Sequence, residues 1–322
     1  MSDTPGANPL SVHPGFTRMF APGRLSLGVY FPIEVFEGSN PTMANQVELA
    51  QRAEALGFAA VWFRDVPLLD PHFGDIGQIY DPWVYLGYIA AQTSTIALAT
   101  GAIVLPLRHP LHTAKAAASV DQISGGRLVL GVATGDRPVE FPAFGRDIEE
   151  RGELFREFLT YFRQALAERF PVIDSPFGYL EGADLVPKPP FGTIPLMIVG
   201  HSQQSVEWIA RNGDAWAMYP RPPHQQQHII AEWRQATEQA APGVFKPFAQ
   251  SLFIDLSTDP EEPPRAIHLG YRLGRNVLIQ LLTTIREIGV SHVVLNLKYG
   301  HRPAGEVLEE VGEYVLPLVT GI

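Results

Sequence analysis

The segment from Ile96 to Gly135 constrains the fold of this chain most strongly. It contains an apolar run over Ile96–Pro106, an alanine-rich helical pattern over His112–Ile123, and a second apolar run over Arg127–Gly135. Two apolar strands joined by a helix predict a parallel β-α-β unit, because the strands of a parallel sheet are covered on both faces. The unit places the chain in the α/β class.

The same alternation continues along most of the chain. The six other predicted strands are Leu25–Pro32, Ala59–Val66, Pro195–Gly200, Ala215–Tyr219, Phe248–Ser257 and His292–Lys298. The seven other predicted helices are Thr42–Leu56, Pro82–Thr93, Glu149–Phe170, Ser202–Asn212, Pro223–Ala240, Asn276–Ile288 and Gly305–Leu318. Eight strand–helix pairs favour a (β/α)8 TIM barrel. An open doubly wound sheet is the alternative, because a count of strands cannot establish closure.

The sequence predicts one large domain. We expect residues 1–23 to form an N-terminal arm and residues 24–322 to form a single barrel domain. The proline- and glycine-rich stretch Pro171–Ile194 is predicted as a long insertion between the fourth helix and the fifth strand. Loops of this length are often functional, so this insertion and the loop Asp70–Asp81 are candidate lids.

Composition excludes several kinds of partner and site. The net charge of −10 and the lack of a long Lys/Arg run argue against nucleic acid and membrane partners. The chain has no cysteine, which excludes disulfides and thiolate chemistry. His224 and His228 have a metal-ligand spacing, but a third ligand is missing, so a solvated helix face is favoured and no metal is expected. With no secretory or membrane-spanning pattern, a soluble cytoplasmic protein is expected.

The segment Ile198–Ser205 is the strongest candidate site that the residues themselves offer. An apolar strand ends at Gly200, and a helix is predicted to begin near Ser202. Glycine permits close backbone approach, the serines supply hydroxyl groups, and a helix start supplies free N–H groups, so the segment suits a phosphate. An ordinary serine cap of the helix is the alternative. A hydrolase is rejected because Gln204 stands where a nucleophile elbow needs glycine.

Two other strand ends carry charge. Thr134–Arg137 ends the fourth strand, where Arg137 could hold an anion at the active face of a barrel, or simply pair with Asp136. Arg64 and Asp65 end the second strand, and they either orient a ligand or pair with each other.

Five phrases in this order resemble the bacterial-luciferase-like family of flavin-dependent oxidoreductases. They are MANQVELAQRAEALGFAAVWFRD, DPWVYLGYIAAQTSTIALATG, LPLRHPLHTAKAAASVDQISGGRLVLGVATG, LVPKPPFGTIPLMIVGHS and WIARNGDAWAMY. The resemblance runs from about Leu25 to Val319 and implies the (β/α)8 barrel. It also implies that the flavin phosphate lies at the fifth strand–helix junction and near the end of the fourth strand, with the flavin ring over the third strand.

The residues and the resemblance together give a set of cofactor-binding candidates and a set of catalytic candidates. The cofactor set is Thr100, Gly101, Ala102, Thr134, Gly135, Asp136, Arg137, Gly200, His201, Ser202 and Ser205. The catalytic candidates are Arg64, Asp65, His109 and His201. They lie at or just after predicted strand ends, so we expect them, together with Arg137, at one rim of the barrel. In related enzymes a non-proline cis peptide supports the flavin ring, which implies a cis bond between Gly101 and Ala102.

One departure from the family pattern bears on activity. Light-emitting members carry histidine directly after the acidic residue of the second strand, whereas Val66 follows Asp65 here, so light emission is not expected. The phrases FRDVP, DIGQIYDP and ATGDRPVEFPAFG instead resemble an uncharacterised luciferase-type oxidoreductase subgroup.

The resemblance implies an FMN-linked monooxygenase that uses reduced flavin and O2 on a small organic substrate. A deazaflavin-dependent hydride-transfer enzyme is the second hypothesis, and a flavin-binding barrel without turnover is the third. A flavin reductase is a possible partner. A homodimer or higher homo-oligomer is expected to form through Pro82–Thr93 and His112–Ile123.

Overall fold

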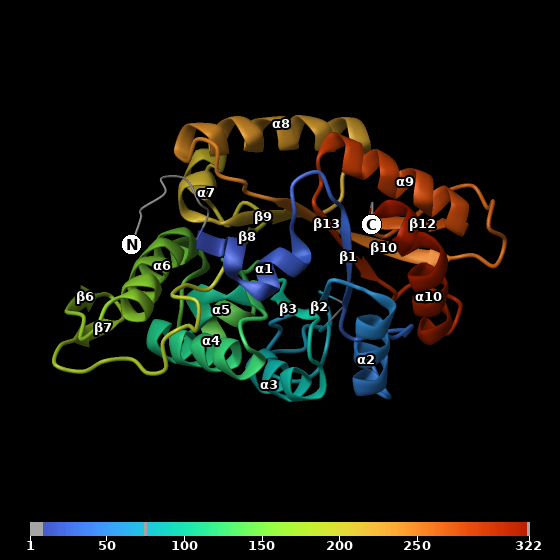
Figure 1. Cartoon of the computed structure of the whole chain (residues 1–322). Coiled ribbons are helices and arrows are strands. Elements are labelled where there is room, and N and C mark those ends of the chain that lie inside the picture. Colours follow the sequence, from blue (N-terminus) through green and yellow to red (C-terminus); the bar gives the residue numbers. More distant parts are fainter. Residues whose placement is uncertain (1–8, 74–75, 321–322) are drawn as a thin grey trace.

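A closed ring of parallel strands forms the centre of the protein (Figure 1). The computed structural model describes residues 9–73 and 76–320. The ring contains β1 (Ser26–Tyr30), β2 (Ala60–Phe63), β3 (Ala97–Thr100), β5 (Leu128–Ala133), β8 (Leu196–Val199), β9 (Ala215–Met218), β10 (Phe248–Leu256) and β13 (His292–Asn296). The ring closes because β10 pairs with both β9 and β13. The predicted (β/α)8 barrel is therefore confirmed, and the open sheet is excluded.

The helices that follow the strands surround the barrel (Figure 1). They are α2 (Gln46–Leu56), α3 (Pro82–Gln92), α4 (Pro110–Ser124), α6 (Arg151–Ala167), α7 (Val206–Asn212), α8 (Pro223–Ala240), α9 (Arg275–Ile288) and α10 (Ala304–Glu310), which continues through a π-helical turn into α11 (Leu316–Val319). Left-handed glycines end α2, α4 and α9 at Gly57, Gly125 and Gly289, because only glycine adopts this conformation at little cost. Among the described residues, no helix could span a membrane.

The segment before β1 packs against the barrel interior. Its helix α1 (Pro14–Met19) lies across the ring of strands in Figure 1. Phe16, Met19 and Phe20 are buried among small inward-facing strand residues, including Ala60 and Ala97. The alanines leave room for this apolar cover, which shields one end of the barrel interior from water. The part of the predicted arm that includes Phe16, Met19 and Phe20 thus contributes to the core, and residues 1–8 of the prediction lie outside the described residues.

A buried chain of hydrogen bonds joins α1 to the barrel wall. The hydroxyl of Ser26 donates to the carbonyl of Met19 and accepts from Nδ1 of His292 at 2.7 Å. Nε2 of His292 accepts from the indole of Trp62 at 3.1 Å, so the neighbours fix one neutral tautomer of the imidazole. Burial, together with the smaller effect of the positive charge of Arg24, lowers the pKa of His292 to about 3. The ring stays uncharged at neutral pH.

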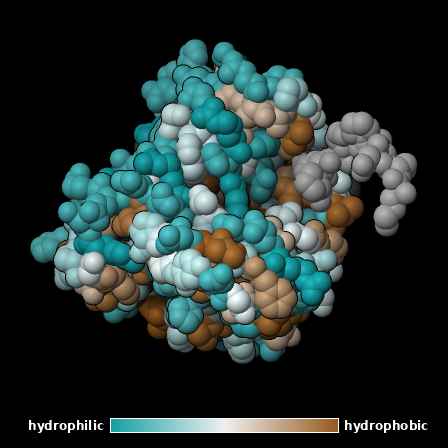
Figure 2. Space-filling model, turned by 90° about the vertical axis from the view of Figure 1, so that its left-hand side faces the viewer, coloured by the Kyte–Doolittle hydropathy of each residue, from teal (hydrophilic) through white to brown (hydrophobic). Residues whose placement is uncertain are grey.

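Two hairpins are added to the eight strand–helix pairs of the barrel. The hairpin of β6 (Ile173–Ser175) and β7 (Gly178–Leu180) belongs to the predicted insertion, which lies on the outer wall. Two contacts hold the insertion there: the ammonium of Lys188 donates to carbonyls near the end of α6, and Gln122 of α4 donates to the carbonyl of Lys188. Figure 2 views the side that carries α6 and this hairpin, a mainly hydrophilic face with small separate apolar groups. The hairpin of β11 (Arg265–Ile267) and β12 (Gly270–Leu273), which the sequence did not predict, pairs with β10.

Candidate functional site

Two connected cavities open at the carboxyl ends of the barrel strands. The first, which we call the β5–β8 lobe, has a volume of about 450 Å³ and is lined by the residues that follow these two strands. The second, the β10–β13 lobe, has a volume of about 880 Å³ and is lined by the ends of β10 and β13 and by the turn of the second hairpin. The lobes share the lining residues Tyr30, Arg64, Phe73, Gly101, Arg137, Tyr219 and Ser251.

The third barrel strand is interrupted where it reaches the cavities. β3 ends at Thr100, and pairing with β5 resumes at β4 (Ile103–Val104). Between them, the peptide bond from Gly101 to Ala102 is cis, as the resemblance predicted. A Cβ atom on Gly101 would lie 2.7 Å from the Trp62 ring and 2.8 Å from the Tyr30 hydroxyl. Only glycine fits this position, so no side chain covers the backbone where Gly101 lines the two lobes.

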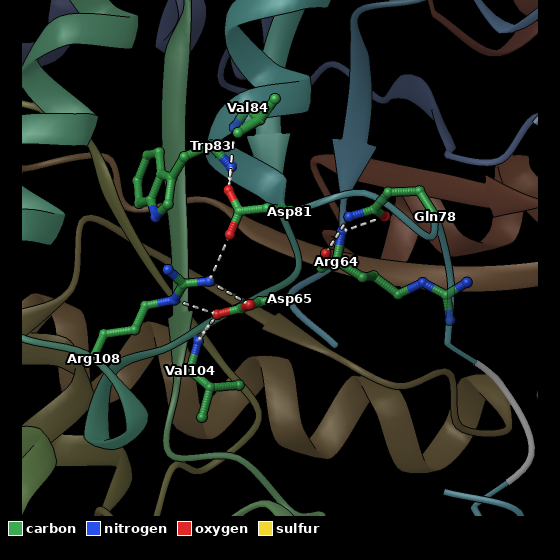
Figure 3. Close-up of polar contacts among 8 residues, drawn as sticks. All are labelled: Arg64, Asp65, Gln78, Asp81, Trp83, Val84, Val104 and Arg108. Carbon is green, nitrogen blue, oxygen red and sulfur yellow. Dashed lines mark hydrogen bonds and ion pairs between the residues drawn. The ribbon is translucent and has the colours of Figure 1, made fainter. Parts of the chain in front are cut away.

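Asp65 anchors the broken strand rather than pairing with its neighbour Arg64 (Figure 3). Its carboxylate accepts two hydrogen bonds from Arg108, at 2.7 and 2.6 Å, and a third from the backbone N–H of Val104 at 3.0 Å. Arg108 also reaches Asp81, whose side chain caps α3, at 3.4 Å. Because these charge-assisted bonds use both carboxylate oxygens, Asp65 is suited to positioning the cavity wall.

Arg64 points away from Asp65 and lines both lobes (Figure 3). Its backbone is held by the amide of Gln78, which accepts from the Arg64 N–H at 2.9 Å and donates to the Arg64 carbonyl. Its guanidinium lies 5.7 Å from the centre of the Tyr30 ring. Gln78 belongs to the loop predicted as a lid, and Phe73 of the same loop lines both lobes, so this loop does border the mouth.

The turn after β5 supplies four of the predicted cofactor residues. Thr134, Gly135, Asp136 and Arg137 all line the β5–β8 lobe. Gly135 has a φ of +82°, and a Cβ atom there would lie 2.7 Å from the Val104 side chain, so glycine is required.

Thr100 has a different place from the rest of the predicted cofactor set. Its side chain is buried, its hydroxyl donates to the carbonyl of Gly131 at 2.7 Å, and it does not line either lobe. It ties the end of β3 to β5, where the two backbones approach closely.

The loop after β8 differs from the expected helix start. Gly200, Ser202 and Gln203 have φ values of +65°, +47° and +57°, so α7 cannot begin at Ser202 and begins at Val206 instead. Gly200, His201, Ser202 and Gln203 line the β5–β8 lobe. Left-handed turn residues direct successive backbone N–H groups into a concavity, which is a common way to bind an anion.

The two serines of this loop serve its own structure. Ser202 donates its hydroxyl to the carbonyl of Val199 at 2.9 Å, and Ser205 caps α7 by accepting from the N–H of Trp208 at 3.2 Å. Ser205 does not line either lobe. The serine-cap alternative therefore describes Ser205. The N–H of Gly200 donates to the carbonyl of Ala217 at 2.8 Å, so a phosphate at this loop, which stays a prediction, would be bound by the backbone N–H groups of residues 201–203.

Arg151, at the start of α6, adds a cation that the sequence did not single out. It lines the β5–β8 lobe beside the loop after β8. The two elements touch: a Cβ atom on Gly152 would lie 2.9 Å from the Gln203 side chain, and Gln204 donates to the carbonyl of Gly152 at 2.9 Å. The missing side chain at Gly152 thus lets the start of α6, which carries Arg151, pack against the loop after β8; the Arg151 guanidinium itself donates to the carbonyl of Ile148 at 2.5 Å.

Glu140 is a second residue that the sequence did not single out. It lines the β5–β8 lobe, only 1% of its surface is exposed, and its Oε1 has no hydrogen-bond partner among the described residues. The pKa of Glu140 is raised to about 7, mainly by burial and also by the negative charges of Asp65 and Asp136. The positive charge of Arg137 and a hydrogen bond from the backbone of Leu68 oppose this shift. The cavity therefore contains a carboxyl group that can hold or release a proton near neutral pH.

The predicted catalytic residues do not all reach the cavity. Arg64, Asp65 and His201 line the β5–β8 lobe, and His201 lies edge-on to Trp216. His109 lies outside both lobes, where Nδ1 accepts from the Leu111 N–H at 3.2 Å and Nε2 contacts the Phe177 carbonyl at 2.9 Å. It caps α4 and holds the outer hairpin, because the chain turns outward into α4 directly after the third strand.

Known proteins resemble this chain in sequence and in fold. The alkanal monooxygenase alpha chain of Photorhabdus luminescens is 29% identical over 168 residues, which are 52% of this chain and 45% of that protein. The chain thus matches about half the length of such curated relatives.

Solved structures resemble it over almost its whole length. An F420-dependent secondary alcohol dehydrogenase has a TM-score of 0.76 at 18% identity, covering 92% of this chain and 99% of that one. The oxygenating constituent of 3,6-diketocamphane monooxygenase from the CAM plasmid of Pseudomonas putida, solved with FMN, has a TM-score of 0.72 at 14% identity, covering 91% and 98%. At these identities the structures support the fold.

The family assignment rests on the sequence itself. The profile of the luciferase-like monooxygenase family matches residues 22–268. The matched range contains seven of the barrel strands, the broken third strand and the whole of the β5–β8 lobe apart from one lining residue, Val294. This chain belongs to the luciferase-like monooxygenase family.

Proposed function

We propose that the protein is a flavin-dependent oxidoreductase that binds FMN in the β5–β8 lobe. In this proposal the phosphate lies against residues 200–203 and Arg151, and the flavin ring lies along Gly101 and Ala102. One observation carries the proposal: a single cavity is lined by the left-handed turn after β8, by Arg151 and by Gly101, where the missing side chain leaves the strand backbone uncovered.

Bound FMN would supply the redox chemistry, with reduced flavin and O2 oxidising a small organic substrate. The protein groups would bind, orient and shield it. Trp62 and Tyr30 form an apolar wall behind Gly101, and the pair of Asp65 and Arg108 holds that wall in place. Glu140 would hold a proton inside the cavity near neutral pH, where a water-exposed carboxyl would already be ionised.

Deazaflavin-dependent hydride transfer is the second candidate. It is favoured by the overall similarity to an F420-dependent alcohol dehydrogenase. A phosphate-bearing cofactor of either kind suits an anion-binding turn beside a guanidinium, so the cavity's charge alone does not choose between them.

The test is an absorbance titration of the purified protein with FMN and with a deazaflavin, followed by a turnover assay. We expect FMN to bind more tightly. In the presence of a flavin reductase and NADH, we expect O2 consumption to rise with an accepted substrate. Tighter deazaflavin binding would favour the second candidate, and FMN that binds without any turnover would favour a flavin-binding barrel. Binding of neither cofactor would contradict the proposal.

A further inference from the structure

A third and smaller cavity lies beside the two lobes, where α8, α9 and the second hairpin meet β10. It has a volume of about 180 Å³, and its walls include Gln226 of α8, Gln250 of β10 and Leu281 of α9. We call it the hairpin pocket. Leu269 also lines the β10–β13 lobe and Gln250 also lines the β5–β8 lobe, so the hairpin pocket adjoins both.

Most of the wall of the hairpin pocket is apolar. The aliphatic lining residues of β10, the hairpin and α9 include Leu252, Ile267, Leu281, Ile285 and Ile288. Among the described lining residues, Arg221 is the only one with a permanent charge, and it is exposed. An apolar cavity of about 150 Å³ can hold benzene, so a pocket of this size suits a ligand with one ring.

Two glutamines place buried amide groups in this apolar wall. Gln226 is 1% exposed, and neither its Oε1 nor its Nε2 has a hydrogen-bond partner among the described residues. Gln250 is 2% exposed, and its Oε1 has no partner there either. A buried polar atom without a partner destabilises the folded state. Three such atoms around one cavity indicate a site whose occupant supplies the hydrogen bonds.

The neighbours of Gln226 show that its burial is particular to this position. Gln225, Gln226 and Gln227 are consecutive residues of α8, and only Gln226 is buried and lines the pocket. Successive helix residues point about 100° apart, so one of three can face the interior while the others face solvent. The exposed glutamines have the ordinary role of a solvated helix surface and provide a control for the buried one.

The amide of Gln226 defines the chemistry of a suitable ligand. A carboxamide offers an acceptor oxygen and a donor nitrogen side by side in one plane. A second carboxamide satisfies both, because its N–H donates to Oε1 and its oxygen accepts from Nε2. A carboxylate has no donor for Oε1, and its charge is costly to bury in an apolar wall.

We propose that the hairpin pocket is a separate binding site for a small neutral carboxamide that carries an apolar ring. The ligand's amide pairs with the amide of Gln226, and its ring contacts the aliphatic side chains of β10 and α9. The site lies outside the cavity proposed for FMN, and its ligand is a different molecule from the flavin.

The test is isothermal titration of the whole protein with three ligands of similar shape. They are benzamide, acetophenone, which has a methyl group in place of the amide nitrogen, and benzoate. We expect benzamide to bind at least five times more tightly than the other two, because it alone supplies both a donor and an acceptor. We also expect saturating FMN to leave benzamide binding in place.

Three results would overturn the proposal. Equal affinities for benzamide and acetophenone, or no benzamide binding at millimolar concentration, would leave ordered water as the partner of the glutamines. A preference for benzoate would assign recognition to Arg221. Displacement of benzamide by FMN would place the ligand in the β5–β8 lobe.

A matched pair of glutamine variants locates the amide. Gln226→Met keeps a similar shape and removes both unpartnered atoms, so it should reduce the preference for benzamide over acetophenone to less than twofold. Gln225→Met, at the exposed neighbour, should leave the preference unchanged. Because Gln226→Met removes unpartnered buried atoms, it should be at least as stable as wild type in thermal unfolding followed by circular dichroism. An unchanged preference in folded Gln226→Met would overturn the assignment.

A second variant tests the place of the ring. Leu281→Trp adds a bulky side chain to the pocket wall and should weaken benzamide binding at least tenfold. Wild-type affinity in folded Leu281→Trp would place the ligand elsewhere.

This proposal and the flavin proposal fail separately. If FMN binds and benzamide shows no preference over acetophenone, the hairpin pocket is not a carboxamide site and the flavin proposal stands. If neither FMN nor deazaflavin binds and the preference persists, the flavin proposal is wrong and the carboxamide site stands.

Discussion

At the scale of single residues, two buried groups with strongly shifted pKa values make the stability depend on pH in opposite directions. His292 is buried and neutral between Ser26 and Trp62, and its pKa of about 3 is lower than the ordinary value of 6.5. Glu140 is buried beside the cavity, and its pKa of about 7 is higher than the ordinary value of 4.5. In each case the folded state disfavours the charged form, because burial removes the water that would solvate it.

For His292, we predict that stability falls as the pH falls. In the unfolded state His292 is protonated below about pH 6.5, whereas in the folded state it stays neutral down to about pH 3. The contribution is fully present above pH 6.5 and decreases toward pH 3, by about 2 kcal/mol at pH 5. In His292→Gln, whose amide can donate to Ser26 and accept from Trp62, the free energy of unfolding should lack this decrease between pH 6.5 and pH 5. Urea unfolding of both proteins at pH 5 and 7.5 measures it, and an equal slope in the variant would contradict the account.

For Glu140, we predict the reverse dependence. The folded state keeps its proton up to about pH 7, whereas the unfolded state loses it near pH 4.5. This contribution is present below pH 4.5 and is lost as the pH rises through 7. Glu140→Gln, which cannot ionise, should therefore be more stable than wild type at pH 8 and similar to it at pH 4.5. Thermal unfolding at the two values checks this, and a variant less stable at pH 8 would refute it.

At the scale of elements, the start of α7 shows that Ser205 has a structural role outside the proposed phosphate site. Ser205 caps α7 and does not line either lobe. Ser205→Ala should lower the free energy of unfolding by about 1 kcal/mol, the usual contribution of a serine cap. The ratio of FMN affinity to riboflavin affinity should stay at the wild-type value. A fall in that ratio, measured by fluorescence titration, would indicate that Ser205 does bind the phosphate.

The sequence predicted most elements because strand and helix periods are local properties. It also placed Arg137 and His201 at the cavity, because the carboxyl ends of barrel strands meet at one face. It could not predict the pairing of Arg108 with Asp65, which joins residues 43 positions apart. Nor could it detect the left-handed backbone at Ser202, since a serine before a helical pattern is the ordinary signal of a helix start.

The second hairpin is another feature that the sequence alone could not predict. β11 and β12 are short, and β12 lies so close to β10 that a Cβ atom on Gly270 would fall 1.8 Å from the carbonyl oxygen of Phe253. Such a contact depends on tertiary packing. The β10–β13 lobe could not be predicted for the same reason, because its lining residues, such as Tyr30, Arg137 and Phe253, are far apart in the sequence and meet only in the closed barrel.

At the scale of the whole molecule, we propose that two copies pair through α3 and α4. Val84 and Tyr88 on α3 and Ile123 on α4 are apolar side chains with 72%, 53% and 66% of their surface exposed. Burying them in a shared interface would remove this surface from water. The protein should sediment as a dimer at micromolar concentration, and Val84→Glu combined with Tyr88→Glu should yield a monomer. A monomeric wild-type protein would reject the proposal.

The most direct test of the central claim compares FMN with riboflavin, which lacks the phosphate. If the loop of residues 200–203 and Arg151 holds that phosphate, wild-type protein should bind FMN at least tenfold more tightly, about 1.4 kcal/mol. Arg151→Met should lower the affinity for FMN and leave that for riboflavin nearly unchanged, whereas Arg169→Met, an exposed control that lines neither lobe, should change neither. Equal affinities of the wild-type protein for FMN and riboflavin would contradict a flavin phosphate in the β5–β8 lobe.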